Sequence, residues 1–252
     1  MSSIPSNVKK RLMVHSDYVC GYECKYCFAK RNDYHNSCRY TSIEDAIVYP
    51  FCDSEILFQD YTCRLTEIVE HSKKYHERII ISISTKAKLP NEVLDFLNDI
   101  SNQLACNNGF LKLSVSITNK SCNDLERGTA SYEERLDLLD RIKTYQFKSS
   151  VVLKPILPFI SESEYIDIVK DTSLFVNKYL IGGLYVDPTT SFYFDYIKDK
   201  YKLEQREVDW LDEGTKWDYI DSTETQKSIK AYISSIGKSV FDNDRDLIMS
   251  WL

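Results

Sequence analysis

The sequence predicts an α/β fold in which a partial (β/α)6 barrel of the TIM type is followed by a short, mainly helical C-terminal extension. Short apolar strands alternate with amphipathic helices, which is typical of parallel βαβ units, and about six units fit before Asp187. The chain has 252 residues and is 43% hydrophobic, enough to bury a core of this size. We therefore expect the barrel in residues 1–187 and an extension packed on it in residues 188–252.

The first part of the chain contains the most regular strand. Continuous β-branched residues at 78–84 favour a strand that is buried on both faces, as in a parallel sheet. The apolar spacing of the segment before it indicates a helix over 63–74. Further elements expected in this part are a first strand at 12–19, a helix start at 41–45 that Pro50 interrupts, and a short second strand at 55–60.

The middle of the chain continues the alternation. Ser131 with Glu134, and Ser161 with Glu164, each have the spacing of a capping box and precede an apolar stripe, so each predicts a helix start. A third amphipathic helix is expected to begin at Pro90. The strands expected between these helices lie at 110–118, 150–155 and 178–186.

The last part of the chain is acidic and less periodic. Between Asp187 and Glu224, acidic residues outnumber basic ones by eleven to five. Helices are expected at 224–237 and 242–252. We expect these segments to pack over the open edge of the barrel or to form a lid, and the acidic stretch is also a candidate surface for a protein partner.

Three cysteines stand close together after the first expected strand. Cys20, Cys24 and Cys27 have the spacing C-x3-C-x2-C. Thiolates favour zinc or iron–sulfur clusters, and a cubane cluster with three cysteine ligands leaves one iron without a protein ligand. A closed four-ligand site is the alternative, for which His15, His35 and Cys38 are the nearby candidates for the fourth ligand.

The cysteine spacing, with Tyr26 and Phe28 on either side of the last cysteine, resembles the radical S-adenosylmethionine (radical SAM) superfamily. The resemblance implies that the three cysteines hold a [4Fe-4S] cluster whose open iron binds S-adenosylmethionine. It also implies reductive cleavage of that cofactor to a 5′-deoxyadenosyl radical, which abstracts hydrogen from a substrate. We expect Tyr26 and Phe28 to shield the cluster from solvent.

Further segments are similar to the spore photoproduct lyase branch of that superfamily. They are Ser84-Thr85-Lys86, the stretch from Glu126 to Thr129, and Glu134-Arg135. The resemblance implies that Lys86 binds the carboxylate of S-adenosylmethionine, and it makes Ser116, Glu126 and Arg135 further candidates for cofactor contact. The usual Gly-Gly-Glu segment is missing, so the group that holds the amino nitrogen is not identified.

The catalytic hydrogen donor is also not identified from the sequence. The branch uses a cysteine near the second strand, and Cys52 and Cys63 are the candidates here. A free cysteine that only packs as a small apolar residue is the simpler interpretation of both.

The charge distribution and the composition indicate which kinds of substrate, electron donor and cellular compartment to expect. The net charge is −6, but residues 1–40 contain seven Lys and Arg residues against three acidic ones. This local excess favours an anionic substrate or an acidic electron donor such as flavodoxin or ferredoxin, and a solvated basic segment is the alternative. No stretch is long and apolar enough to span a membrane, no signal pattern precedes the first strand, and the scattered cysteines do not form a disulfide framework, so we expect a cytoplasmic protein.

Two functions from different classes follow. The first is a radical SAM enzyme, for which the branch likeness favours a nucleotide or nucleic-acid substrate, with small metabolites and peptides left open. The second is a non-enzymatic four-cysteine iron–sulfur or zinc module for electron transfer or redox sensing, with Cys38 as the fourth ligand.

Overall fold

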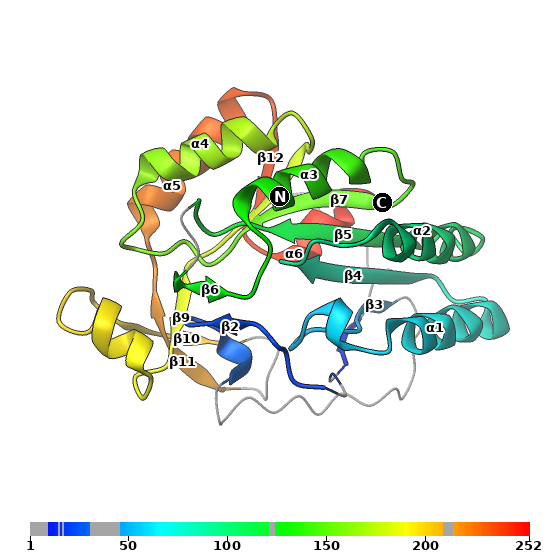
Figure 1. The fold of residues 1–252 in the computed structure, drawn as a ribbon, viewed down its shortest axis with the longest axis horizontal. Coiled ribbons are helices and arrows are strands. Elements are labelled where there is room, and N and C mark those ends of the chain that lie inside the picture. The colour runs from blue at the N-terminus through cyan, green and yellow to red at the C-terminus, as the bar shows by residue number, and fades with distance from the viewer. Residues whose placement is uncertain (1–9, 15, 17, 31–45, 121–123, 209–213) are drawn as a thin grey trace.

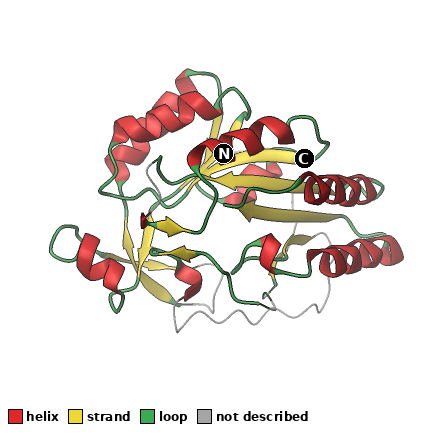
Figure 2. Ribbon diagram, in the orientation of Figure 1, coloured by secondary structure: helices red, strands yellow, loops and turns green. Residues whose placement is uncertain are grey.

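A computed structural model describes residues 10–14, 16, 18–30, 46–120, 124–208 and 214–252. Its centre is a parallel sheet of seven strands in the order β1-β3-β4-β5-β7-β8-β12, as expected for a partial barrel (Figures 1 and 2). Because the strands are parallel, all their carboxyl ends lie at one edge of the sheet. The strands are β1 (Lys10–Met13), β3 (Ala46–Tyr49), β4 (Ile79–Thr85), β5 (Phe110–Ser116), β7 (Lys148–Leu153), β8 (Lys178–Ile181) and β12 (Ser239–Phe241).

Most helices pack on one face of this sheet. Alternate strand residues such as Ile81, Leu113 and Val151 point to that face and join the helices in the main hydrophobic core. In the described part of the chain, no helix has the length and apolar character needed to cross a membrane. The helices with residues in this core are α1 (Tyr61–Tyr75), α2 (Asn91–Ala105), α3 (Tyr132–Ile142), α4 (Glu162–Thr172) and α5 (Thr223–Ser235).

The opposite face of the sheet is covered in part by the C-terminal helix α6 (Asp244–Met249). The strand residues that alternate with those of the main core, among them Ile80 and Phe110, pack there against Leu247 and Ile248. The C-terminal extension therefore contributes to the barrel as well as covering it, because β12 is the seventh strand of the sheet and α6 packs on the sheet's second face.

Two smaller sheets lie at the carboxyl ends of the strands, toward which the arrows of β4 and β5 point in Figure 1. One pairs β2 (Glu23–Cys24) with β6 (Glu126–Arg127) in antiparallel orientation. The other has the order β10-β11-β9, with β10 (Glu204–Glu207), β11 (Lys216–Ile220) and β9 (Leu184–Val186). A π-helical turn, η4 (Tyr193–Ile197), follows β9.

The predicted second strand at 55–60 is wrong. Residues Ile56–Phe58 form a short 3-10 helix, η2, and Asp60 caps α1 by accepting a hydrogen bond from the Cys63 amide at 3.1 Å. The second strand in sequence that joins the main sheet is β3, where the apolar run Ala46–Tyr49 pairs with β1 and β4. The helix start expected at 41–45 lies outside the described residues.

The strand predicted over 178–186 is divided in two. Gly182 and Gly183 separate β8 from β9, which belong to different sheets. A Cβ atom at Gly183 would lie 2.4 Å from the Ile220 carbonyl oxygen, so only glycine allows this close passage. At Ser161, the expected capping box is incomplete, because the Glu164 carboxylate accepts a hydrogen bond from the Lys120 amide instead.

A buried ion pair joins α6 to the sheet. The fully buried Lys112 of β5 contacts Asp244, which also accepts a hydrogen bond from Ser82 at 3.0 Å. Burial by itself would raise the pKa of Asp244, but the Lys112 ammonium and hydrogen bonds from Lys112, Tyr49 and Ser82 bring that pKa below its ordinary value.

We predict that Asp244→Asn lowers the free energy of unfolding by about 3–5 kcal/mol, because Lys112 is left as an uncompensated buried charge. A depressed carboxyl pKa stabilises the fold above the unfolded-state pKa of about 3.9. The difference between the wild type and the variant should therefore be constant near neutral pH and shrink as the pH falls through the folded-state pKa. Chemical denaturation at a series of pH values measures it.

Asp242→Asn is the matched control, because Asp242 is exposed and pairs with Lys230 at the surface. Its loss should cost less than about 1 kcal/mol. Equal effects of the two substitutions would contradict the assignment of Lys112 and Asp244 as a buried structural pair.

Candidate functional site

The cysteine loop is held against the carboxyl edge of the main sheet by backbone hydrogen bonds. In the β2–β6 pair, Cys24 lies opposite Glu126, and the Lys25 amide donates to the Leu125 carbonyl at 2.9 Å. Just after β2, the Cys27 amide donates to the Cys24 carbonyl at 3.3 Å, which closes a tight turn. The pairing therefore fixes the loop next to the residues that follow β5.

The three thiols influence one another electrostatically. Cys24 is buried, whereas Cys20 and Cys27 are half-buried. Burial raises the pKa of Cys24 to about 11, with Lys86 acting in the opposite direction and Glu126, Cys27 and Cys20 adding to the rise. Burial also raises the pKa of Cys20, to which Cys27 contributes. A metal that binds these sulfurs would have to displace their protons.

Three thiols within one loop are the soft donor set that an iron–sulfur cluster or a zinc ion requires. Among the described residues, no three His, Cys, Asp or Glu side chains converge on a point where one metal ion would bind. The thiolates of a cubane each bind a different iron, so they surround the cluster and need not meet at one point. The proposed fourth ligands of the closed alternative, His15, His35 and Cys38, all lie outside the described residues.

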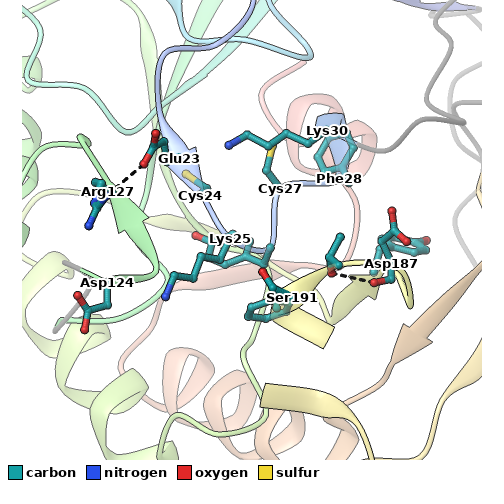
Figure 3. A pocket seen from close by; sticks show the side chains of 14 residues that line it. Glu23, Cys24, Lys25, Cys27, Phe28, Lys30, Asp124, Arg127, Asp187 and Ser191 are labelled. Atoms are coloured by element: carbon teal, nitrogen blue, oxygen red, sulfur yellow. Dashed lines mark hydrogen bonds and ion pairs between the residues drawn. The ribbon is translucent and has the colours of Figure 1, made fainter. Parts of the chain in front are cut away.

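A pocket of about 420 Å³ is lined in part by Cys24 and Cys27 of the cysteine loop (Figure 3). The cysteine loop forms one wall, and the segment from β9 to η4 forms another, with Tyr185 and Phe192. Its charged lining residues are the cations Lys25, Lys30 and Arg127 and the acids Glu23, Asp124 and Asp187, and Arg127 lies 3.6 Å from the Glu23 carboxylate.

The ammonium of Lys86 contacts both the sulfur of Cys24 and the hydroxyl of Tyr26. Lys86 follows directly after β4, and its Nζ lies 3.8 Å from the Cys24 Sγ and 3.1 Å from the Tyr26 hydroxyl. Tyr26 is buried and packs edge-on against Phe192 at 6.3 Å between ring centroids. The structure thus brings together three residues that the sequence connected only through a family resemblance.

The carboxylate of Glu126 lies behind this group, and its side chain has no exposed surface. One of its oxygens accepts hydrogen bonds from Tyr26 and, at 2.9 Å, from Thr118, and lies 3.2 Å from the Lys86 Nζ. Its other oxygen is 2.7 Å from Arg135. Burial raises the pKa of Glu126, while the charge and hydrogen bond of Arg135 act to lower it.

Arg135 occupies a buried position in the first turn of α3, near the capping box formed by Ser131 and Glu134. Besides Glu126, it donates to the carbonyl oxygen of Ser116 at 2.8 Å and to that of Ala130 at 3.0 Å. Its guanidinium therefore ties α3 to β6 and to the end of β5.

The other predicted cofactor residues occupy different surroundings. Ser116 is buried, and by the alternation of the strand it lies on the same face of the sheet as Ser114, opposite the main core. On that face the Ser114 hydroxyl forms a hydrogen bond of 2.8 Å with the Ser150 hydroxyl. Phe28 begins the 3-10 helix η1 (Phe28–Lys30), is partly exposed and lines the pocket.

The two candidate hydrogen donors differ in position. Cys52 lies just after β3, and its thiol donates to the Val14 carbonyl at 3.3 Å, close to the carboxyl edge of the sheet. Cys63 is exposed on α1, where the neighbouring Glu67 raises its pKa.

Sequence reasoning missed Glu55. This carboxylate is buried and accepts hydrogen bonds from the Thr85 hydroxyl at 2.6 Å and the Lys86 amide at 2.9 Å. Burial raises its pKa, and the hydrogen bond from Thr85 is the main effect in the opposite direction. The available indication in the sequence was a single acidic residue directly before the apolar run Ile56–Phe58. It was not recognised, because Glu55 was included in the expected strand at 55–60.

No protein-family model matches the sequence, and no curated protein matches it either. Solved structures do match. A spore photoproduct lyase mutant with bound AdoMet and dinucleoside spore photoproduct is 16% identical, with 92% of this chain and 76% of that chain covered at a TM-score of 0.64. A second spore photoproduct lyase mutant is 17% identical, with 96% and 79% covered at a TM-score of 0.65.

A third match is the radical S-adenosylmethionine methyltransferase TsrM from Kitasatospora setae, with tryptophan substrate and a SAM analogue bound. It is 13% identical, with 90% of this chain and 52% of that chain covered at a TM-score of 0.51. At such identities the likeness concerns the fold. The chain therefore has the fold of the radical SAM superfamily, and this fold is similar to that of the spore photoproduct lyase branch.

Proposed function

We propose that this protein is a radical SAM enzyme in which Cys20, Cys24 and Cys27 hold a [4Fe-4S] cluster. When bound, the cluster and S-adenosylmethionine would supply a 5′-deoxyadenosyl radical for hydrogen abstraction from a substrate. The observation that carries the proposal is the contact of the Lys86 ammonium with both the sulfur of Cys24 and the hydroxyl of Tyr26, on a cysteine loop that also lines a pocket.

The residues around the cysteines have separable tasks in this proposal. Lys86, as a compact cation near the sulfur, binds the carboxylate of S-adenosylmethionine. Tyr26 is buried and Phe28 partly exposed, and both exclude water from one side of the cluster. Ser116 contributes a polar group from the end of β5. Cys52 and Cys63 are the two candidates for hydrogen donor.

The fold likeness also supports a substrate class. One structural neighbour is solved with a dinucleoside spore photoproduct. Here Lys25, Lys30 and Arg127 line the pocket beside the acids Glu23, Asp124 and Asp187, together with the aromatic rings of Phe28 and Tyr185. Cations that meet phosphates and rings that stack on bases are the usual means of binding single-stranded nucleic acid. We propose a nucleotide or nucleic-acid substrate.

Three wider expectations stay with this proposal. We propose that residues 1–187 carry the cofactor chemistry and that residues 188–252 pack on them, with a protein partner able to use the acidic C-terminal part. The same cations in the lining of the pocket suit an acidic electron donor such as flavodoxin or ferredoxin. The reducing cytoplasm is the compartment that keeps these thiols free.

The reaction class is tested by anaerobic reconstitution with iron and sulfide, followed by dithionite and S-adenosylmethionine. We predict that the wild type forms 5′-deoxyadenosine and that Cys24→Ala lowers this formation at least about 100-fold, because the site loses a thiolate ligand. Chromatography of the quenched reaction measures the product.

Cys38→Ala is the control that separates the two function classes. It should leave the iron content and the product unchanged, because the proposed cluster uses three cysteines. Loss of the cluster in Cys38→Ala, or zinc as the bound metal in the wild type, would favour the non-enzymatic four-ligand module instead.

The substrate class has its own test. We predict that replacing Lys25 and Lys30 by glutamine weakens binding of a 12-nucleotide single-stranded DNA about 10-fold in low salt. The slope of log affinity against log salt concentration should become shallower by the equivalent of about one to two phosphate contacts. Fluorescence anisotropy of a labelled strand against the reconstituted protein measures both quantities.

The matched control replaces Lys143 and Lys170, which are exposed and form surface ion pairs on the helical side of the fold. Binding should be unchanged there. If wild-type protein does not bind the strand, or if both double variants weaken binding equally, the nucleic-acid assignment is wrong even where 5′-deoxyadenosine is formed.

A further inference from the structure

Four side chains form a continuous path from α3 to a cysteine of the loop. Arg135 lies 2.7 Å from one oxygen of Glu126, the other oxygen of Glu126 lies 3.2 Å from the Lys86 Nζ, and that Nζ lies 3.8 Å from the Cys24 Sγ. The path crosses four elements, since the residues come from α3, β6, the end of β4 and β2.

Neither Arg135 nor Glu126 has a free surface for a ligand. Their side chains are 1% and 0% exposed. The Arg135 Nε donates to Ala130, its Nη1 to Ser116, and its Nη2 to both Glu126 and Thr129. Both carboxylate oxygens of Glu126 also have partners within the protein. These two residues therefore cannot contact a cofactor in the way that the family resemblance implied.

We propose instead that Glu126 and Arg135 are positioning residues, which hold the Lys86 ammonium at the sulfur of Cys24 and so set both the affinity for S-adenosylmethionine and the charge around the cluster. This inference rests on the proposed function. Lys86 remains the group that touches the cofactor, because 18% of its side chain is exposed whereas Glu126 has no exposed surface.

The order of charges explains why such a set can be buried. A cysteine binds metal as a thiolate. The path then reads as guanidinium, carboxylate, ammonium and thiolate, so that each charge has an opposite charge next to it and the sum is zero. Buried ions are tolerated when they are paired and hydrogen-bonded in this way, and removal of one member leaves its neighbour uncompensated.

Glu126→Gln is the main test, because it keeps the size of the side chain and removes one negative charge from the path. We expect S-adenosylmethionine to bind at least about 10-fold more weakly, since the Lys86 ammonium is no longer held in place. We also expect the midpoint potential of the cluster to shift upward, because less negative charge lies near the iron that accepts the electron. An EPR-monitored redox titration measures the midpoint potential, and the change of the EPR spectrum as S-adenosylmethionine is added in steps measures its affinity.

Arg135→Lys separates geometry from charge. It keeps the cation but loses the planar fork that holds Glu126, Ser116 and Ala130 together. We expect weaker binding of S-adenosylmethionine with little change in the midpoint potential. Thermal melting of both variants reports the purely structural cost.

Asp137→Asn is the control, because Asp137 forms an exposed carboxylate–arginine pair with Arg141 on the same helix. It should change neither the midpoint potential nor the cofactor-induced EPR change. If Glu126→Gln lowers the melting temperature but leaves both spectroscopic quantities at their wild-type values, the positioning role is wrong and the path is only structural. A wild type that forms no cluster would instead overturn the proposed function.

Discussion

The burial of one carboxylate between two cations is the constraint on which the candidate site depends. Glu126 has no exposed side-chain surface, and desolvation of a charge is costly unless opposite charges and hydrogen-bond donors surround it. Arg135 and Lys86 supply the charges, while Tyr26 and Thr118 supply hydroxyl donors. Satisfying this one group therefore brings α3, the ends of β4 and β5, and the cysteine loop to the same place.

Buried charges have different roles on the sheet face that α6 covers and at the carboxyl edge of the sheet. On the sheet face covered by α6, Lys112 and Asp244 form a pair within an apolar cluster, and the pair ties the C-terminal helix to the sheet. At the carboxyl edge, the path from Arg135 ends at Lys86, which is partly exposed and lies beside the sulfur of Cys24. The pair of Lys112 and Asp244 is satisfied within the protein and stabilises the fold. The path from Arg135 ends at Lys86, whose partly exposed ammonium can bind a ligand.

The cysteine loop has little regular structure of its own and takes its position from other parts of the chain. The two residues of β2 pair with β6, and the pocket beside the loop is completed by residues from β9 to η4, more than 150 positions later in the sequence. The narrow passage at Gly183 brings β9 away from the main sheet and into this wall. The C-terminal third of the protein thus takes part in the site as well as in the barrel.

The sequence by itself determined the alternation of strands and helices, the helix starts at Ser131 and Ser161, and the cysteine spacing, because periodicity, capping and ligand spacing are local properties. It failed at residues 46–60, where a short apolar run became β3 only through pairing with β1 and β4, and where a capped 3-10 helix replaced the expected strand. It singled out Lys86, Glu126 and Arg135 through a resemblance, but it did not separate the accessible cation from the two buried residues behind it, and it missed Glu55. Only the tertiary structure decided these points, because burial and hydrogen bonding between residues far apart in the chain depend on how the strands, helices and loops pack together.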